Sequence, residues 1–283
     1  MTTLATMRLL IGDALEQLRT LPDGSVNTCI TSPPYGDLIV YGSTETVEPA
    51  EYADWLLPMI QEIARVLVAG GILALNLNGQ GSFLFPEEVA WRIPRETELI
   101  LHERVCWVKT NAIPVGYRGS HLIPEWEPIW VFRKGDRLAY FGRDDIRRPY
   151  TETTVRRAER KNVHRDRHGN HRDQRHPYVR ADKPEFVNPL GRDAPNVIEA
   201  APEQSPKWPH PSRFPEAIPV FFILAYCPEG GTVLDPFAGS GTTLAVANRL
   251  GRHAIGIELN PEYLPLIERR CQQGGFVFAE VTP

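Results

Sequence analysis

Two short segments at opposite ends of the sequence carry side chains that could do chemistry. The first, residues 31–35, reads Thr-Ser-Pro-Pro-Tyr and follows an apolar run that predicts a buried strand. Two consecutive prolines make such a turn rigid, and it would present the Ser32 hydroxyl, a backbone carbonyl without a competing local donor and the flat ring of Tyr35. Two acceptors that hold the N–H groups of a ring-conjugated amine would favour the pyramidal geometry in which its lone pair attacks. A proline-rich turn with a surface tyrosine is the alternative interpretation.

The second segment, residues 235–243, reads Asp-Pro-Phe-Ala-Gly-Ser-Gly-Thr-Thr between a predicted strand and a predicted helix. Its glycines, Gly239 and Gly241, permit a tight turn and the close approach of a ligand to the backbone. The N–H groups at the start of the helix would then face an anionic group. The segment is not a phosphate-binding P-loop, because no lysine precedes Thr242, and Leu244 replaces the third glycine of a dinucleotide fingerprint.

An acidic residue strengthens the ligand-binding interpretation of this glycine turn. Glu258 closes the next predicted strand, 17 positions after Gly241. A carboxylate at that place can accept hydrogen bonds from ribose hydroxyls. Taken alone, Glu258 would be an acid near the start of the helix that begins around Pro261.

The elements that must position these residues follow from the apolar pattern, which alternates strands and helices. This order predicts an α/β fold with a mostly parallel central sheet flanked by helices, in which both segments can lie at the carboxyl edge. The expected strands are residues 26–30, 72–77, 104–108, 127–132, 232–234 and 254–257, with an edge strand at 276–279. The expected helices are residues 51–68 (stopped by Gly70-Gly71), 86–99, 214–226, 242–250 and 261–271.

A long middle region interrupts this pattern and is predicted to be an insertion. The domain would consist of residues 1–135, an inserted basic region at 136–206, and residues 207–283. Between 143 and 183 there are 13 Lys/Arg against 7 Asp/Glu, so this block is +6 and the rest of a chain of net charge −4 is −10. Such asymmetry is typical of a nucleic-acid contact surface, and a solvated loop without a ligand is the alternative. The candidate phosphate contacts are Arg147, Arg148, Arg156, Arg157, Arg160, Lys161, Arg165 and Arg167.

Composition excludes several classes of protein. No apolar run approaches the roughly 18 residues that cross a bilayer, and the first residues lack the pattern of a signal peptide. Cysteines 29, 106, 227 and 271 are widely spaced, which indicates reduced thiols and neither a disulfide framework nor a metal site. We therefore expect a cytoplasmic protein without a membrane partner or a bound metal.

The two segments and their order resemble the amino-methyltransferases of bacterial restriction–modification and orphan DNA modification systems, of the circularly permuted β group. The resemblance covers nearly the whole chain. The catalytic S/D-P-P-Y motif of that family matches Ser32, Pro33, Pro34 and Tyr35 and comes first. The AdoMet motif D-P-F-x-G-S-G-T-T matches residues 235–243, and the target-recognition region of the family falls between the two motifs. The resemblance implies the Rossmann-like fold of S-adenosyl-L-methionine (AdoMet)-dependent methyltransferases.

Smaller matches agree with this family. Ile11-Gly12-Asp13 resembles the segment whose acid contacts the cofactor adenine, and residues 210–215 resemble the segment that closes over the cofactor. Residues 105–109 with Pro114 resemble a later active-site strand. The cofactor-binding residues that the resemblance and the motif chemistry imply are Asp13, Pro211, Phe214, Asp235, Phe237, Gly239, Gly241, Thr242, Thr243 and Glu258.

The implied reaction is methyl transfer from AdoMet to the exocyclic amino group of a base extruded from double-stranded DNA, with Tyr35 stacked on that base. Ser32 before Pro-Pro favours cytosine-N4 within the family, and adenine-N6 stays open. Cytosine-C5 methylation is disfavoured because it needs a thiolate, usually after a proline, and no cysteine here follows one. The rival hypotheses are methylation of RNA or of a protein amide, a non-catalytic DNA-binding module, and a nucleotide-dependent oxidoreductase. A cognate restriction endonuclease and a homodimer are expected only by analogy with the family.

Overall fold

The computed structural model describes residues 5–34, 47–79, 84–111, 125–159, 188–203, 215–272 and 278–282 of the chain. Within these ranges the protein divides into two compact units. The larger comprises Met1–Gly142 and Pro195–Pro283, and the smaller comprises Arg143–Ala194.

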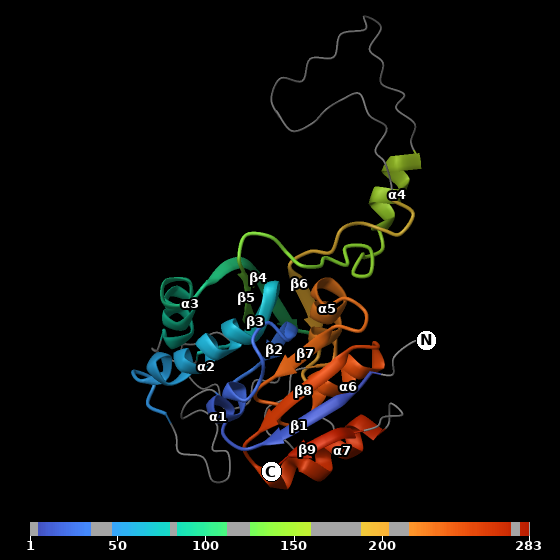
Figure 1. Ribbon diagram of the computed structural model, residues 1–283. Helices are drawn as coiled ribbons and strands as arrows, with labels where there is room; N and C mark the ends of the chain where they lie inside the picture. Colours follow the sequence, from blue (N-terminus) through green and yellow to red (C-terminus); the bar gives the residue numbers. More distant parts are fainter. Residues whose placement is uncertain are drawn as a thin grey trace, which may run out of the picture. The chain divides into compact units, whose positions relative to one another are not determined.

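The described strands of the larger unit form one sheet, in the order β6-β4-β5-β3-β2-β7-β8-β1-β9 (Figure 1). Among them, β5 alone runs antiparallel to its neighbours, β3 and β4. The prediction of a mostly parallel central sheet is therefore confirmed. The strands are β1 (Met7–Ile11), β2 (Val26–Thr31), β3 (Leu67–Asn76), β4 (Leu99–Lys109), β5 (Trp126–Lys134), β6 (Val197–Ala200), β7 (Thr232–Asp235), β8 (His253–Glu258) and β9 (Phe278–Thr282).

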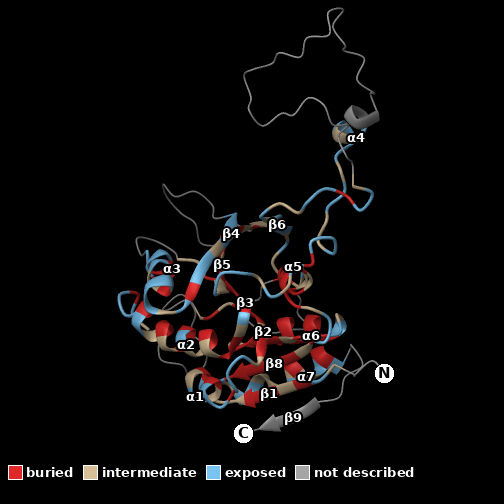
Figure 2. Ribbon diagram, turned by 45° about the horizontal axis from the view of Figure 1, so that its top comes forward, coloured by how far each residue is buried: buried red, intermediate tan, exposed pale blue. Residues whose placement is uncertain are grey.

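Helices cover both faces of this sheet, with α1, α2 and α3 on one face and α5, α6 and α7 on the other (Figure 1). On α2, apolar side chains such as Leu56, Ile60 and Ile63 recur at helical spacing and are buried. Figure 2 shows buried residues gathered on the central strands and on the helix faces turned toward them. The helices are α1 (Ala14–Arg19), α2 (Tyr52–Val66), α3 (Phe85–Glu96), α5 (Ala217–Tyr226), α6 (Thr242–Arg249), the 3-10 turn η2 (Pro261–Tyr263) and α7 (Leu264–Gln272).

The Gly70-Gly71 pair does not end α2 as predicted. The helix stops at Val66, and the glycines lie inside β3. Gly70 has a φ of +80°, and a Cβ at this position would lie 2.3 Å from the Ala139 amide nitrogen, whose N–H donates to the Gly70 carbonyl. The glycine is therefore required because another backbone segment passes against the strand.

The smaller unit is narrower than the predicted insertion at 136–206. β6 lies inside the predicted insertion but belongs to the main sheet, where it pairs in parallel with β4. The indole N–H of Trp107 on β4 also donates to the Ala200 carbonyl at 2.9 Å. The described part of the smaller unit contains α4 (Glu152–Glu159) and two segments joined where Arg148 and Arg192 exchange backbone hydrogen bonds.

Candidate active site

The sheet order brings the two predicted segments to one edge. β2 and β7 are adjacent and parallel, and β8 lies beside β7 on the other side. Ser32 directly follows β2, while Asp235 ends β7 and Glu258 ends β8. All three residues therefore lie at the carboxyl edge of neighbouring strands, although Ser32 and Asp235 are more than 200 positions apart in the sequence.

A buried hydrogen bond joins the two segments. The Thr31 hydroxyl donates to Asp235 Oδ1 at 2.8 Å, and the Phe237 amide donates to the same oxygen at 3.2 Å. Asp235 is almost completely buried. Burial raises the pKa of Asp235 to about 6, and hydrogen bonds from two threonine hydroxyls and one backbone amide oppose that rise. Asp235 is thus a structural link between the Ser-Pro-Pro turn and the glycine turn.

The glycine turn is shaped by left-handed backbone at Gly239 and Gly241, with φ of +52° and +77°. A Cβ on Gly241 would lie 3.0 Å from a methyl group of Ile267. The turn leads into α6, whose N-cap residue is Gly241 and therefore has no side chain to bond the first N–H groups of the helix. The N-terminus of α6 at the carboxyl edge is suited to an anionic group of a ligand.

Glu258 holds the glycine turn from the neighbouring strand. One of its carboxylate oxygens accepts from the Gly239 amide at 2.7 Å, and the other accepts from the Asn260 amide at 2.9 Å. Burial raises the pKa of Glu258 to about 6, these backbone hydrogen bonds oppose the rise, and the negative charge of Asp235 adds to it. Because each carboxylate oxygen has two lone pairs, Glu258 retains acceptor capacity for ribose hydroxyls.

Asp13 lies next to this group because β1 pairs with β8. It is exposed, and its side chain caps α1 by accepting from the Glu16 amide at 3.0 Å. The preceding Gly12 amide donates to the Glu258 carbonyl at 2.9 Å. The residue predicted to contact the adenine is therefore brought to the same edge as the glycine turn, and it also has a local structural role.

The Ser-Pro-Pro turn has a hydrogen-bond donor that sequence reasoning missed. The Tyr52 hydroxyl, on α2, donates to the Pro34 carbonyl at 2.7 Å. Pro33 is buried, and Ser32 and Pro34 are partly buried. Tyr35, Pro211 and Phe214, which were predicted to stack on the base or close over the cofactor, lie outside the described residues, as does Pro114.

A polar network at the same edge also escaped the sequence interpretation. Asn76 ends β3, beside the strand that leads to Ser32, and its amide donates to Glu127 at 3.2 Å. Glu127 in turn pairs with Lys109 at 2.5 Å. Lys109 ends the strand segment 105–109 that resembles an active-site strand, and this segment was the only sequence signal for the network.

The predicted phosphate contacts differ in their surroundings. The Arg147 side chain is only 10% exposed and pairs with Asp144 at 2.6 Å and Asp193 at 2.9 Å. Arg148, by contrast, is exposed. Arg156 and Arg157 lie on α4, and the others lie outside the described residues: Arg160, Lys161, Arg165 and Arg167. The ion pairs of Arg147 favour a role in the fold of the smaller unit.

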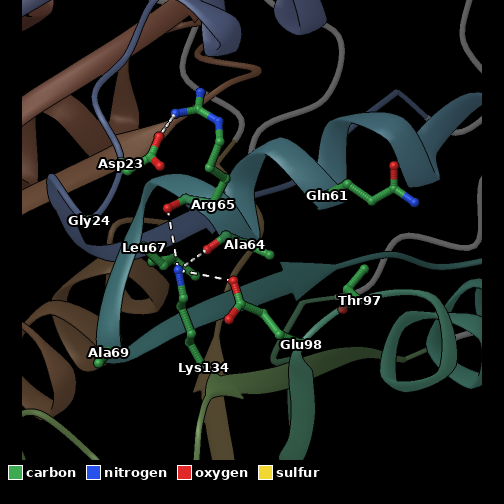
Figure 3. Close-up of a pocket in the computed structure, with 10 residues that line it drawn as sticks. All are labelled: Asp23, Gly24, Gln61, Ala64, Arg65, Leu67, Ala69, Thr97, Glu98 and Lys134. Atoms are coloured by element: carbon green, nitrogen blue, oxygen red, sulfur yellow. Dashed lines mark hydrogen bonds and ion pairs between the residues drawn. The ribbon is translucent and has the colours of Figure 1, made fainter.

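A hollow of about 620 Å³ lies at the opposite, amino edge of the sheet (Figure 3). Its cations are already neutralised within the protein. Lys134 donates to the Ala64 carbonyl at 2.8 Å and pairs with Glu98 at 3.0 Å, and Arg65 pairs with Asp23. These cations stabilise the C-terminus of α2, so we assign the hollow to the fold and not to the active site.

The described residues contain no group of three His, Cys, Asp or Glu side chains placed to hold a metal ion. None of the described helices is long and apolar enough to cross a membrane. The four cysteines are free, and three of them are buried.

The fold and the edge at which the two segments meet define an AdoMet-dependent methyltransferase fold. The structure matches PvuII DNA methyltransferase (cytosine-N4-specific) with a TM-score of 0.67 and 23% identity, over 95% of this chain and 87% of that chain. It also matches a DNA modification methylase from Thermus thermophilus in complex with S-adenosyl-L-methionine, with a TM-score of 0.61 and 26% identity, over 98% of this chain and 100% of that chain.

The sequence matches agree with this fold. The model of a DNA methylase family, N6_N4_Mtase, matches residues 26–269. The DNA adenine methyltransferase YhdJ of Escherichia coli (strain K12) is 31% identical, over 95% of this chain and 84% of YhdJ. The type II methyltransferase M.ScaI of Streptomyces caespitosus is 28% identical, over 92% of this chain and 80% of M.ScaI. The chain therefore belongs to this DNA methylase family and is a DNA amino-methyltransferase, as the sequence motifs predicted.

Proposed function

We propose that this enzyme methylates the exocyclic N4 of cytosine in double-stranded DNA, with the target base turned out of the helix. The observation that carries the proposal is the 2.8 Å bond from Thr31 to Asp235, which fixes the Ser-Pro-Pro turn beside the glycine turn. An amine held by one turn would face a methyl donor held by the other. Positioning of this kind can supply a large part of a rate enhancement.

The methyl donor is S-adenosyl-L-methionine, and the residues at the carboxyl edge fit it. We assign the uncapped N-terminus of α6 to the carboxylate of its methionine part, Glu258 to the ribose hydroxyls and Asp13 to the adenine. When bound, this cofactor supplies an electrophilic methyl group on a sulfonium. The remaining residues of the proposed cofactor site are Asp235, Phe237, Gly239, Gly241, Thr242 and Thr243, with Pro211 and Phe214 closing over it.

The Ser-Pro-Pro-Tyr turn would activate the amine. We assign one N–H of the amine to the Ser32 hydroxyl oxygen and the other to the Pro33 carbonyl, because the Pro34 carbonyl already accepts from Tyr52. These two acceptors turn the nitrogen lone pair out of conjugation with the base and toward the methyl donor. Tyr35 would stack on the extruded base.

Adenine-N6 is the second candidate target. Ser32 before Pro-Pro supports cytosine, whereas the 31% identity to a protein named DNA adenine methyltransferase supports adenine. Incubation with isotope-labelled AdoMet and unmethylated DNA, followed by mass spectrometry of the nucleosides, separates the two. N4-methylcytosine supports the first proposal and N6-methyladenine the second, and a product with neither label contradicts both.

Replacement of Ser32 tests the catalytic turn. We expect Ser32→Ala to lower turnover on duplex DNA by about 10²-fold, because an acceptor for the amine is lost, while AdoMet binding measured by calorimetry stays within twofold. A variant that loses cofactor binding but keeps its chemical rate would reverse this assignment.

The same proposal extends to the partners of the enzyme. We infer that exposed arginines of the smaller unit contact DNA phosphates, in the cytoplasm where bacterial DNA lies. The similarity to type II methyltransferases supports a cognate restriction endonuclease with the same recognition sequence. A homodimer remains part of the proposal, and light scattering of the purified protein tests it.

A further inference from the structure

The first turn of α2 contacts both halves of the proposed site. Tyr52 and Trp55 are three positions apart, so they lie on the same side of the helix. The Tyr52 hydroxyl donates to the Pro34 carbonyl at 2.7 Å. The Trp55 ring lies with its centroid 6.1 Å from that of Phe237, in the glycine turn. One rigid helix therefore spans the distance between the two turns.

The hydroxyl of Tyr52 is held in place by its own ring. The residue is fully buried, and its ring packs against Phe85 at 4.5 Å and Trp55 at 5.4 Å between centroids. A buried tyrosine needs a hydrogen-bond partner for its hydroxyl, and here that partner includes the Pro34 carbonyl. The ring thus supplies packing, while the hydroxyl acts on the turn.

The contact has a consequence for the next residue. The peptide group between Pro34 and Tyr35 is planar, because its C–N bond has partial double-bond character. A hydrogen bond that fixes the Pro34 carbonyl therefore also fixes the plane through which the chain enters Tyr35. In this way a side chain of α2 sets the direction of the residue proposed to stack on the base.

We propose that Tyr52 is a positioning residue for methyl transfer, which orients the Pro34–Tyr35 peptide and thereby the extruded base. The proposal rests on the proposed function, in which the Ser-Pro-Pro-Tyr turn holds the target amine. It concerns the Tyr52 hydroxyl alone, because the Tyr52 ring would keep α2 packed without it.

Tyr52→Phe tests the proposal because it removes the hydroxyl and keeps the ring. The matched control is Tyr226→Phe, which removes a hydroxyl from another buried ring, on α5. The substrate is a duplex that carries the recognition sequence mapped by sequencing. We expect kcat of Tyr52→Phe to fall roughly 10- to 100-fold, since small misplacements of reacting groups have effects of that size. The dissociation constant of AdoMet and the thermal midpoint should stay close to those of Tyr226→Phe.

A second measurement does not depend on turnover. A duplex with 2-aminopurine in place of the target base reports stacking, because stacking quenches its emission. With Tyr52→Phe bound and no cofactor, we expect emission to rise toward the level given by Tyr35→Ala, because the base stacks less well on a misdirected Tyr35. Emission equal to that of the unmodified enzyme would overturn the proposal.

The kinetic outcomes separate this proposal from the proposed function. If Ser32→Ala is inactive but Tyr52→Phe keeps kcat within twofold, the positioning role is wrong and the proposed function stands. A loss of kcat that follows an equal loss of AdoMet affinity would place the effect at Trp55 and the cofactor, and would also overturn it. If Ser32→Ala remains fully active, the proposed function itself fails.

Discussion

Asp235 shows how a single buried carboxyl can hold a site together at a thermodynamic cost. Burial raises its pKa from an ordinary value of 3.8 to about 6. The native protein therefore binds more protons at this group than the unfolded chain between about pH 4 and 6. Its contribution to the free energy of unfolding falls as the pH rises through that window and is constant above it. The hydrogen bond from Thr31 reduces this cost when Asp235 is ionised.

Thr31→Val should lower the free energy of unfolding more at high pH than at low pH. At pH 7.5 Asp235 is ionised, so loss of the donor is expected to cost about 1.5–3 kcal/mol. At pH 5 the carboxyl is mostly protonated, and the cost should be smaller. Urea denaturation at both pH values measures this difference.

Thr28→Val is the matched control, because the Thr28 hydroxyl donates at 3.1 Å to a neutral carbonyl, that of Tyr226, on the same strand. Its cost should be about 0.5–1.5 kcal/mol at both pH values. An equal pH dependence in the two variants would show that Thr31 does not act through the charge of Asp235.

At this scale the sequence predicted residue types but not their partners. Asp235 and Glu258 stood out because of their spacing from the glycines. The bonds from Thr31 to Asp235 and from Tyr52 to Pro34 could not be predicted, since they depend on which strands and helices become neighbours. No local pattern in the sequence encodes that choice.

Among the elements, α6 and β8 are unusually close because of Gly256. A Cβ on this glycine would lie 2.5 Å from one methyl group of Leu244 on α6 and 3.3 Å from Ala238 in the glycine turn. Both neighbours are buried. The missing side chain thus lets the helix and the turn of the proposed cofactor site pack directly on the strand.

Gly256→Ala should therefore disturb the cofactor site through packing alone. We expect a loss of about 1–3 kcal/mol in the free energy of unfolding, which is typical of overpacking a core, together with weaker AdoMet binding measured by calorimetry. Adding Leu244→Val shortens the opposing side chain and should restore part of both losses. If the double variant is worse than the single one in both measurements, the clash with Leu244 is not the cause.

Elements with a strong apolar period were predictable, and short ones were not. The spacing on α2 and the apolar runs of β2, β7 and β8 gave their approximate positions. β6 was placed in the predicted insertion because its four residues show no period. It is a strand because β4 offers an edge with which it can pair, and pairing partners are a tertiary property.

For the molecule as a whole, the smaller unit separates arginines that hold its fold from arginines that face solvent. Arg147 and Arg143 both pair with Asp193, so they join the two ends of the unit. The excess of positive charge in the sequence could not distinguish them from exposed arginines such as Arg148. Charge counts give the sign of a surface, whereas the placement of acidic partners decides which cations can meet DNA.

Arg148→Gln and Arg147→Gln should have opposite effects. Arg148→Gln is expected to reduce the salt dependence of DNA affinity by about 0.9 in the slope of log K against log salt concentration, the effect of one phosphate contact. Arg147→Gln should leave the slope unchanged and make residues 143–194 more sensitive to limited proteolysis. Fluorescence anisotropy with labelled duplex between 50 and 200 mM salt measures the slopes, and a reversed pattern would contradict the assignment.

The order of strands in the sheet has a consequence for how the enzyme is made in the cell. Met7 on β1 pairs with Ala254 on β8, 247 positions later. At about 5–20 residues per second, a ribosome needs roughly 10–50 s to synthesise the intervening chain. During that time β1 has no partner, and the edge of β2 that later receives β7 stays open. The nascent protein therefore cannot gain stability from its cofactor until translation has passed β8, which makes it a natural client for chaperones that shield apolar strands.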